Sequence, residues 1–482
     1  MNTLTIAWIG LPFFIGFVIY LIPKLDRYLA LLMGLASIGY AALIFANSSP
    51  ITLQLLDTFG VSLLVDPLTA YFILTNALVT TAVVIYCWQT EKTPFFYAQT
   101  IILHGSVNAA FVCTDFISLY VALEVLSIAA FLLIAYPRTD RSIWVGLRYL
   151  FTSNVAMLFY LVGAVLVYQT HHSFAFAGVR GAPPEALALI FLGLLVKGGI
   201  FVSGLWLPLT HSESEAPASA MMSGFVVKAA VLPLIRCALV VEEIDPIVRA
   251  FGVGTAVLGV FYAAFEKDTK RMLAFHTVSQ LGFILAAPEV GGFYALTHGL
   301  VKSALFLIAG SLPSRSFKEL QQKAIATPLW IALVAASFSI SGFPMLSGFG
   351  AKVLTMKNLV PWQVIGMNIA AWGTAISFAK FIFLPRRDSK LLEEQKPLTT
   401  GFWIAVIGLI SGLLLANVVY FEAYTLQNII KPLATIALGW LAYFLVFRRL
   451  SVRLPRMLEQ LDHLMGMMSL MLVFLFWAVF AT

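Results

Sequence analysis

The chain has 482 residues, of which 60% are hydrophobic and only 11% are charged, and its mean hydropathy is +0.93. Because soluble domains carry roughly a quarter charged residues, this composition excludes a soluble globular protein and indicates a polytopic membrane protein. The net charge of +7 would suit nucleic acid, but the basic residues lie in alternate loops, so we attribute them to membrane topology and expect no nucleic-acid partner.

Apolar runs of about twenty residues, about sixteen in all, recur along the chain with short polar loops between them, as a bilayer core about 30 Å thick requires. They extend from Thr5 to Ala481. The first run has no charged segment before it and no Ala-x-Ala site, which predicts a retained helix rather than a cleaved signal peptide. Since no hydrophilic segment is long enough to fold separately, we expect one all-α membrane domain.

Basic residues gather in alternate loops, at Lys24 and Arg27, Arg138 and Arg141, 267–271, 315–323, Arg386 and Arg387, and 448–456. The intervening loops carry acidic residues, among them Asp57, Asp115 and Glu242. The positive-inside rule then predicts that the basic loops are cytoplasmic and that both termini lie outside.

The sequence gives no sign of a bound cofactor or metal. Cys87, Cys113 and Cys237 lie far apart and form no C-x-x-C pair, which argues against an iron–sulfur cluster, c-type haem and a disulfide framework. The nucleotide motifs G-x-G-x-x-G after a strand and G-x-x-x-x-G-K-[ST] are absent, as is the zinc motif H-E-x-x-H. We therefore expect no redox catalysis by this chain alone.

Two segments interrupt the helical pattern: "GLWLPLTHSESEAPAS" (204–219) and "SISGFPMLSGFGAK" (339–352). Proline and glycine at this density break an intramembrane helix, and freed backbone groups persist there only inside protein or beside water. The breaks are roughly five helices apart, and an odd number of helices per unit inverts the second unit. We therefore predict N-terminal helices in 1–96, two inverted five-helix repeats in 97–242 and 246–384, and C-terminal helices in 385–482.

Charged residues lie within or beside these apolar runs, namely Glu124, Lys197, Lys228, Lys302 and Lys352, and His298 lies one turn before Lys302 on the same face. Each unpaired charge costs about 2.5–3.5 kcal/mol at the bilayer centre, so the five would cost over about 10 kcal/mol. One acid cannot pair with four bases. Static ion pairs between helices are the alternative for a single charge, but the set indicates function.

A buried lysine prefers its neutral form, whereas a nearby carboxylate favours the charged form. Movement of Glu124 toward or away from Lys197 would therefore make the lysine take up or release a proton. A row of such groups linked by water is a switchable proton path.

The remaining histidines carry weaker signals. His211 lies beside the first break with Glu213 and Glu215, where it is a candidate for proton uptake at the cytoplasmic mouth, although a solvated loop position is an equal alternative. His276, near a helix start, is better explained as a structural residue.

Six segments resemble, in order and spacing, the antiporter-like subunits shared by respiratory complex I and Mrp-type multisubunit sodium/proton antiporters. The likeness extends from Asp66 to Leu384, and its segments are "NAAFVCTDFISLYVALEVLSIAAFLLIAY", "LLVKGGIFVSGLWLPLTHSESEAP", "SGFVVKAAVLPLIR", "DTKRMLAFHTVSQLGFI", "THGLVKSALFLIAG" and "SGFPMLSGFGAK". Within that family, the asparagine–alanine–alanine–phenylalanine run and Lys352 most resemble the D-type member of the Mrp antiporters.

The resemblance implies a fold of about fourteen core transmembrane helices, 14–16 in total, with two inverted five-helix repeats and two broken helices. Glu124 matches the family's glutamate, which pairs with the lysine matched by Lys197. The resemblance also makes Lys228 the lysine of the next helix, His298 with Lys302 the central link, and Lys352 the terminal charge. Two further helices, near 426–447 and 463–481, follow the core, and the basic segment between them is expected along the membrane surface.

Three functions remain open from the sequence. The first is a proton-translocating subunit of a multisubunit monovalent cation (Na⁺)/H⁺ antiporter, in a prokaryotic plasma membrane, with other membrane subunits as partners. The second is a proton-pumping subunit of an NAD(P)H or ferredoxin:quinone oxidoreductase. A purely structural scaffold is the third, and the buried charges argue against it.

Overall fold

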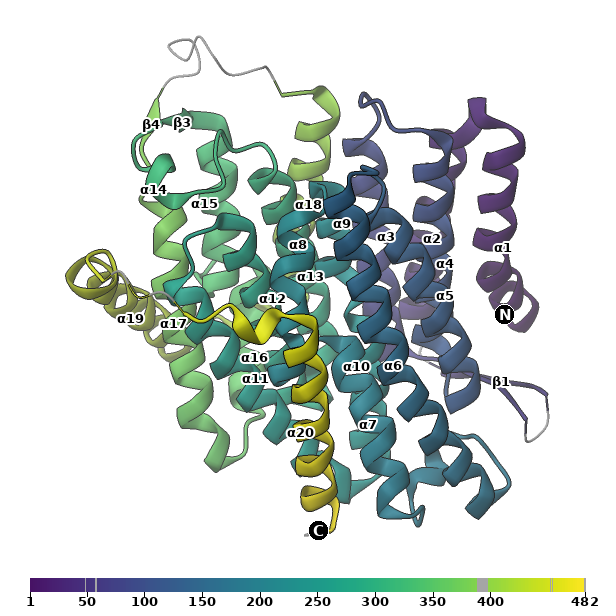
Figure 1. Ribbon diagram of the computed structural model, residues 1–482. Coiled ribbons are helices and arrows are strands. Elements are labelled where there is room, and N and C mark those ends of the chain that lie inside the picture. Colours follow the sequence, from purple (N-terminus) through teal and green to yellow (C-terminus); the bar gives the residue numbers. More distant parts are fainter. Residues whose placement is uncertain (48, 57–58, 388–397, 451, 453, 481–482) are drawn as a thin grey trace.

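The computed structural model is a helical bundle that describes residues 1–47, 49–56, 59–387, 398–450, 452 and 454–480 (Figure 1). By length and composition, 14 helical segments in this described part are candidate membrane spans. The predicted all-α polytopic membrane fold is confirmed. Asp57 and Arg453, which contributed to the topology prediction, lie outside the described residues.

The N-terminal part pairs two helices with a short hairpin before the third helix begins. Its elements are α1 (Asn2–Leu21), α2 (Asp26–Ala46), β1 (Ile51–Leu56), β2 (Gly60–Val65) and α3 (Pro67–Tyr86). β1 and β2 are antiparallel, with Ile51 opposite Val65. Asp66 accepts a hydrogen bond from the Thr69 N–H and so caps α3. Arg236, in the later helix α10 (Lys228–Val240), donates to both carboxylate oxygens of Asp66, at 2.6 and 2.7 Å.

The next five helical passes contain the first interruption. They are α4 (Pro94–Val112), α5 (Phe116–Ile134), α6 (Asp140–His171), α7 (Pro184–Gly198) continued by the 3₁₀ turn η3 (Phe201–Trp206) and α8 (Leu207–Glu213), and α9 (Ala216–Met221) continued by the π-turn η4 (Met222–Val226) and α10 (Lys228–Val240). α7 ends because Gly199 adopts a φ of +69°, a left-handed backbone conformation that residues other than glycine rarely adopt.

Five more passes follow and contain the second interruption. They are α11 (Asp245–Phe265), α12 (Thr269–Ala286), α13 (Gly291–Ala309), α15 (Thr327–Ser341) with α16 (Ser347–Lys357), and α17 (Val364–Ile382). The short α14 (Phe317–Leu320) and the parallel pair β3 (Ile325–Ala326) and β4 (Arg386–Arg387) lie at one end of this part (Figure 1). Gly342, at φ +84°, ends α15 as Gly199 ends α7. The second break lies within its predicted segment, 339–352. The first begins at Gly199, before the predicted segment 204–219, of which Leu207–Glu213 is helical. The inverted relation of the two units stays a prediction.

α12 and α13 form the centre of the bundle (Figure 1), and every residue of both is buried. A helix with no exposed face must find partners for its polar groups inside the protein.

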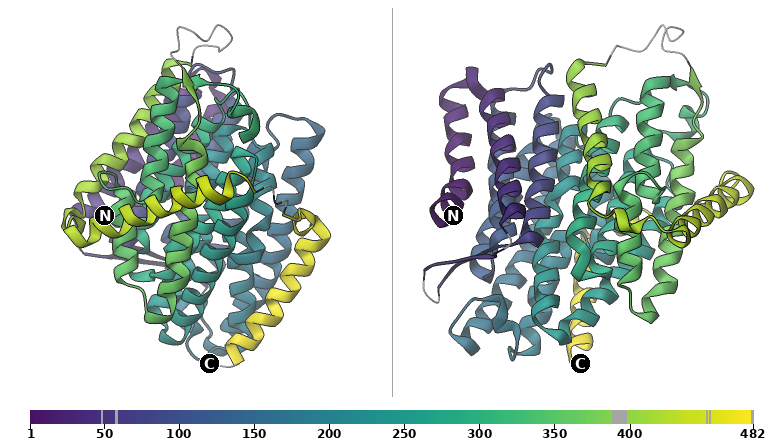
Figure 2. Two further views of the ribbon diagram at one scale, coloured as in Figure 1. Left: turned by 90° about the vertical axis from the view of Figure 1, so that its left-hand side faces the viewer. Right: turned by 180° about the vertical axis from the view of Figure 1, so that it is seen from behind.

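The C-terminal part consists of α18 (Thr400–Val418), α19 (Leu426–Ala442) and α20 (Leu461–Phe480). Both helices expected after the core are therefore observed. The yellow-green α19 lies across the outside of the bundle rather than alongside the other helices (Figure 2), and only its Ile436 and Gly439 are buried. That the basic stretch between α19 and α20 lies on a membrane surface stays a prediction.

Candidate functional site

The four lysines singled out from the sequence all lie inside the bundle. Lys197, Lys228, Lys302 and Lys352 expose 5%, 0%, 0% and 7% of their surface, and they come from α7, α10, α13 and α16. None of them forms an ion pair with a described carboxylate, so hydroxyl and carbonyl groups, aromatic rings or enclosed space surround each ammonium. This differs from a set of static salt bridges.

Lys197 occupies the last turn of α7, directly before the helix break. Its ammonium donates to the Ser127 hydroxyl of α5 and, at 2.6 Å, to the Ser153 hydroxyl of α6. Glu124, one turn before Ser127, makes no ion pair with Lys197 here, and its buried Oε1 has no hydrogen-bond partner. The Lys197 ammonium is thus bound by two serine hydroxyls. The resemblance had implied a direct pair between Lys197 and Glu124.

Lys228 begins α10, immediately after the π-turn η4. In this turn the Val227 N–H bonds to the Met222 carbonyl, five residues earlier. The ammonium donates to the carbonyls of Ser223, at 3.0 Å, and Gly224. α13 reaches this site because Gly299 has no side chain: a Cβ there would lie 2.8 Å from the Gly224 oxygen.

Lys302 and His298 lie on one face of α13, as predicted from their spacing. The Lys302 ammonium donates to the Leu273 carbonyl of α12 and lies 5.0 Å from the centre of the Phe306 ring. His298 exposes 2% of its surface, and neither ring nitrogen has a hydrogen-bond partner. It lies within electrostatic reach of both Lys228 and Lys302, so the structure brings these three groups together.

The second broken helix places Lys352 near the same centre. Its buried ammonium has no hydrogen-bond partner and lies 5.4 Å from the centre of the Phe283 ring. Between His298 and this break is a cavity of about 10 Å³, lined by Gln280, Tyr294, Thr297, His298, Val301, Ser339, Ile340 and Gly348. This is about the space of one water molecule, and His298 and the unpartnered Ser339 hydroxyl both face such a site.

His211 is fully buried within α8 and is not a solvated loop residue. Its ring stacks on Phe306 with centroids 4.7 Å apart, and both ring nitrogens lack partners. Glu213 and Glu215 follow it and are partly exposed, paired with Arg141 and Lys92. A buried imidazole therefore lies between partly exposed carboxylates and the aromatic ring that Lys302 also touches.

His276, interpreted from the sequence as a structural residue, lies in the same buried region as Lys302 and Lys352. The ring is buried, neither nitrogen has a partner, and it lies within electrostatic reach of Lys302 and Lys352. His276 follows Leu273, the acceptor of Lys302, by one turn. Sequence reasoning missed Ser127 and Ser153; the spacing of Ser127, three residues after Glu124, was the one available signal.

The row is not continuous in this structure. Glu124 and Lys197 form one group, and Lys228, His298, Lys302, His276 and Lys352 form a second. Among the described residues, no side-chain hydrogen bond joins Lys197 to Lys228. Nor does the described part contain a group of three or more histidine, cysteine or acidic side chains placed to hold a metal ion.

Comparison with known proteins shows which family contains this chain. The sequence profile of the NADH:quinone oxidoreductase/Mrp antiporter transmembrane family matches residues 113–377, which include every residue of both groups. The chain belongs to this family. α1 to α4 precede the matched residues, and α18 to α20 follow them.

The relatives include subunits of quinone oxidoreductases and a subunit of a Na(+)/H(+) antiporter. The chain is 28% identical to the N subunit of NADH-quinone oxidoreductase from Desulforudis audaxviator, over 75% of this chain and 85% of the relative. It is 26% identical to the D subunit of the Na(+)/H(+) antiporter from Alkalihalophilus pseudofirmus, over 83% of this chain and 90% of the relative.

Solved structures give the same fold. A chain of the Mrp complex from Dietzia sp. DQ12-45-1b superposes with a TM-score of 0.72 at 20% identity, over 96% of this chain and 99% of that one. A chain of the membrane-bound sulfane sulfur reductase, an archaeal respiratory membrane complex, superposes with a TM-score of 0.76 at 20% identity, over 92% and 99%. Both belong to multisubunit membrane assemblies.

Proposed function

We propose that this chain is the proton-translocating membrane subunit of a multisubunit monovalent cation (Na⁺)/H⁺ antiporter. The observation that carries the proposal is the set of four buried lysines with no described carboxylate bound to any of them. When a lysine ammonium is hydrogen-bonded to a neutral hydroxyl or carbonyl, loss of its proton leaves no unpaired negative charge behind. Each of these lysines can therefore alternate between its charged and neutral forms. The relationship to the D subunit of a Na(+)/H(+) antiporter supports the cation coupling.

The residues take distinct roles in this proposal. His211 receives protons from the partly exposed Glu213 and Glu215. Lys228, His298 and Lys302 pass them across the centre, where the cavity beside His298 has space for a bridging water.

At the two broken helices, Lys197 and Lys352 gain or lose a proton as the charge around them changes. Glu124 sets the state of Lys197 by approaching or leaving the Ser127–Ser153 site. The chain itself catalyses no redox step, and its partners are other membrane subunits.

The orientation in the membrane is part of the proposal. In Figure 1 the turn between α1 and α2 and the β3–β4 pair lie at the same end of the bundle, whereas the C-terminus lies at the opposite end. The loops with Lys24 and Arg27 and with Arg386 and Arg387 are thus on one side, as the positive-inside rule requires for cytoplasmic loops. Both termini then lie outside a prokaryotic plasma membrane.

A proton-pumping role in a quinone oxidoreductase is the second candidate, because the relatives include the N subunit of an NADH-quinone oxidoreductase at similar identity. Purification of the tagged complex from its own host separates the two. The proposal predicts no flavin or iron–sulfur absorption in the complex, and a sodium gradient that drives proton movement in reconstituted vesicles. Stoichiometric flavin or iron–sulfur absorption, with no response to sodium, would support the second candidate.

A further inference from the structure

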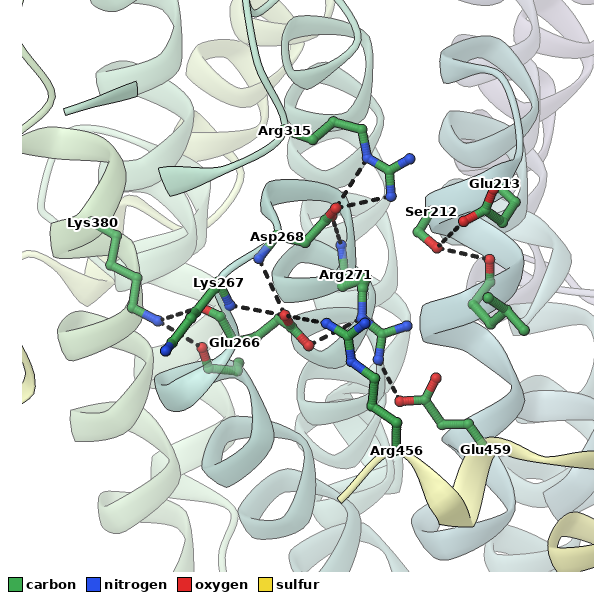
Figure 3. A network of polar contacts seen from close by, with 12 residues as sticks. Ser212, Glu213, Glu266, Lys267, Asp268, Arg271, Arg315, Lys380, Arg456 and Glu459 are labelled. Atoms are coloured by element: carbon green, nitrogen blue, oxygen red, sulfur yellow. Dashed lines mark hydrogen bonds and ion pairs between the residues drawn. The ribbon is translucent and has the colours of Figure 1, made fainter. Parts of the chain in front are cut away.

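Glu459 is a buried carboxylate outside residues 113–377, which the family profile matches. It belongs to the short turn η11 (Met457–Glu459), which precedes α20. Its side chain is only 8% exposed, and it accepts a hydrogen bond from Arg271, whose side chain is 6% exposed (Figure 3). Arg271 also donates to Glu266 at 3.1 Å. An ion pair between Glu459 and Arg271 therefore connects the C-terminal segment to the start of α12.

A second buried arginine, on another helix, interacts electrostatically with the same carboxylate without forming an ion pair with it. Arg148 of α6 is 4% exposed, and all three of its side-chain nitrogens are buried without a hydrogen-bond partner. Among the described carboxylates, Glu459 is the one with which it has a resolved electrostatic interaction. A buried guanidinium needs a nearby negative charge, so Glu459 balances one arginine from α6 and one from α12.

These two arginines lie close to the lysine sites along their own helices. Arg271 is two residues before Leu273, whose carbonyl accepts the Lys302 ammonium. Arg148 is five residues before Ser153, whose hydroxyl accepts the Lys197 ammonium. A change in the position of α6 or α12 at Glu459 would therefore move an acceptor of one of the lysines.

α20, which follows Glu459, also contacts the first broken helix. It packs against α7 and η3, the segments on either side of the break. Its inward stripe consists of Leu464, Met468, Met471 and Leu475, all at most 3% exposed, at the spacing of one helix face. The C-terminal segment thus contacts the Lys197 helix and, through Glu459, the helix that binds Lys302.

We propose that Glu459 is a positioning residue for proton transfer, and that residues 457–480 form a strap that holds α6 and α12 in register at the two lysine sites. The proposal rests on the proton-translocating function above. Loss of the Glu459 charge frees the starts of α6 and α12, so the acceptors of Lys197 and Lys302 lose their alignment.

The test compares three variants in the complete complex. Glu459→Gln removes the charge, Glu459→Asp keeps it, and Met471→Ala loosens the apolar stripe of α20 without changing any charge. We expect Glu459→Gln to lower transport per assembled complex at least tenfold, Glu459→Asp to retain at least half, and Met471→Ala to stay within twofold of wild type. Equal loss in all three variants, or a wild-type rate in Glu459→Gln, would overturn the proposal.

Hydrogen–deuterium exchange separates this proposal from the function on which it rests. In Glu459→Gln the amides of 141–153 and 269–276 should exchange at least tenfold faster, and in Met471→Ala they should not. Unchanged exchange overturns the strap. Faster exchange in a complex whose wild type moves no protons supports the strap and contradicts the proposed function.

Discussion

Lys197 shows how a charged side chain is kept inside the bundle without a carboxylate partner. Its two hydroxyl acceptors come from two other helices, α5 and α6. The position of the lysine in an apolar run was evident from the sequence, whereas these acceptors were not, because they lie 70 and 44 residues away. Contacts at such separation depend on helix packing rather than on local pattern.

Removal of both acceptors should weaken transport. In the double variant Ser127→Ala, Ser153→Ala the ammonium loses its two hydrogen-bond partners among the described residues, each worth about 1.5–3 kcal/mol for a charged donor. We expect proton transport per assembled complex to fall about tenfold or more. Ser106→Ala is the control, since the buried Ser106 hydroxyl bonds to the Leu103 carbonyl of its own helix. A wild-type rate in the double variant would show that the serines do not hold the transported charge.

Glu266, in the loop before α12, makes stability depend on pH. Burial alone raises its pKa, but the Arg271 guanidinium and the N–H groups of Lys267 and Asp268 outweigh burial and hold the pKa below the usual 4.5. A lowered folded-state pKa stabilises the folded protein above about pH 4.5, and this contribution is lost as the pH falls through the folded-state pKa.

The thermal unfolding midpoints of wild type and Glu266→Gln should therefore differ most near neutral pH. Their difference should narrow as the pH falls below about 4.5. A difference that stays constant down to about pH 3 would show that the carboxylate charge is not what stabilises this loop.

At the scale of elements, the second broken helix followed from local chemistry, because Gly342, at φ +84°, ends α15 inside the predicted segment. In the first broken helix, α7 ends at Gly199, at φ +69°, before the segment that was predicted to break it. The burial of α8 did not follow. The polar segment around His211 reads as a loop, but its carboxylates are paired with Lys92 and Arg141 from distant parts of the chain, and Lys270 donates to the Ser214 carbonyl at 2.9 Å. Basic side chains from other parts of the chain thus make a polar segment suitable for the interior.

The halves of the second broken helix approach each other through Gly348. A Cβ at this position would lie 1.9 Å from the Ser339 carbonyl oxygen, a backbone atom that cannot turn away. Overpacking of this kind costs about 1–3 kcal/mol. Gly348→Ala should therefore lower the thermal midpoint of the complex, whereas Gly350→Ala, where the nearest atoms are 3.8 Å away, should not. Equal midpoints for the two variants would contradict the close packing of α15 and α16.

At the scale of the whole molecule, composition predicted a polytopic membrane protein, but it could not give the course of α19. A span of 22 residues with a hydropathy of 1.8 meets the requirement for a membrane crossing, yet the structure lays α19 across the bundle, where Gly439 contacts α17. Length and hydropathy permit a crossing without fixing an orientation. The direction of such a helix depends on the surface against which it packs.

The role of the buried lysines can be measured as cation-dependent dissipation of an imposed pH gradient in inverted vesicles that contain the complete complex. Wild type is compared with Lys197→Ala, and with Lys24→Ala as a control at an exposed lysine between α1 and α2. We predict a sodium-dependent signal in wild type and Lys24→Ala, and loss of the signal in Lys197→Ala with assembly intact. A full signal in assembled Lys197→Ala would contradict proton transfer through the buried lysines.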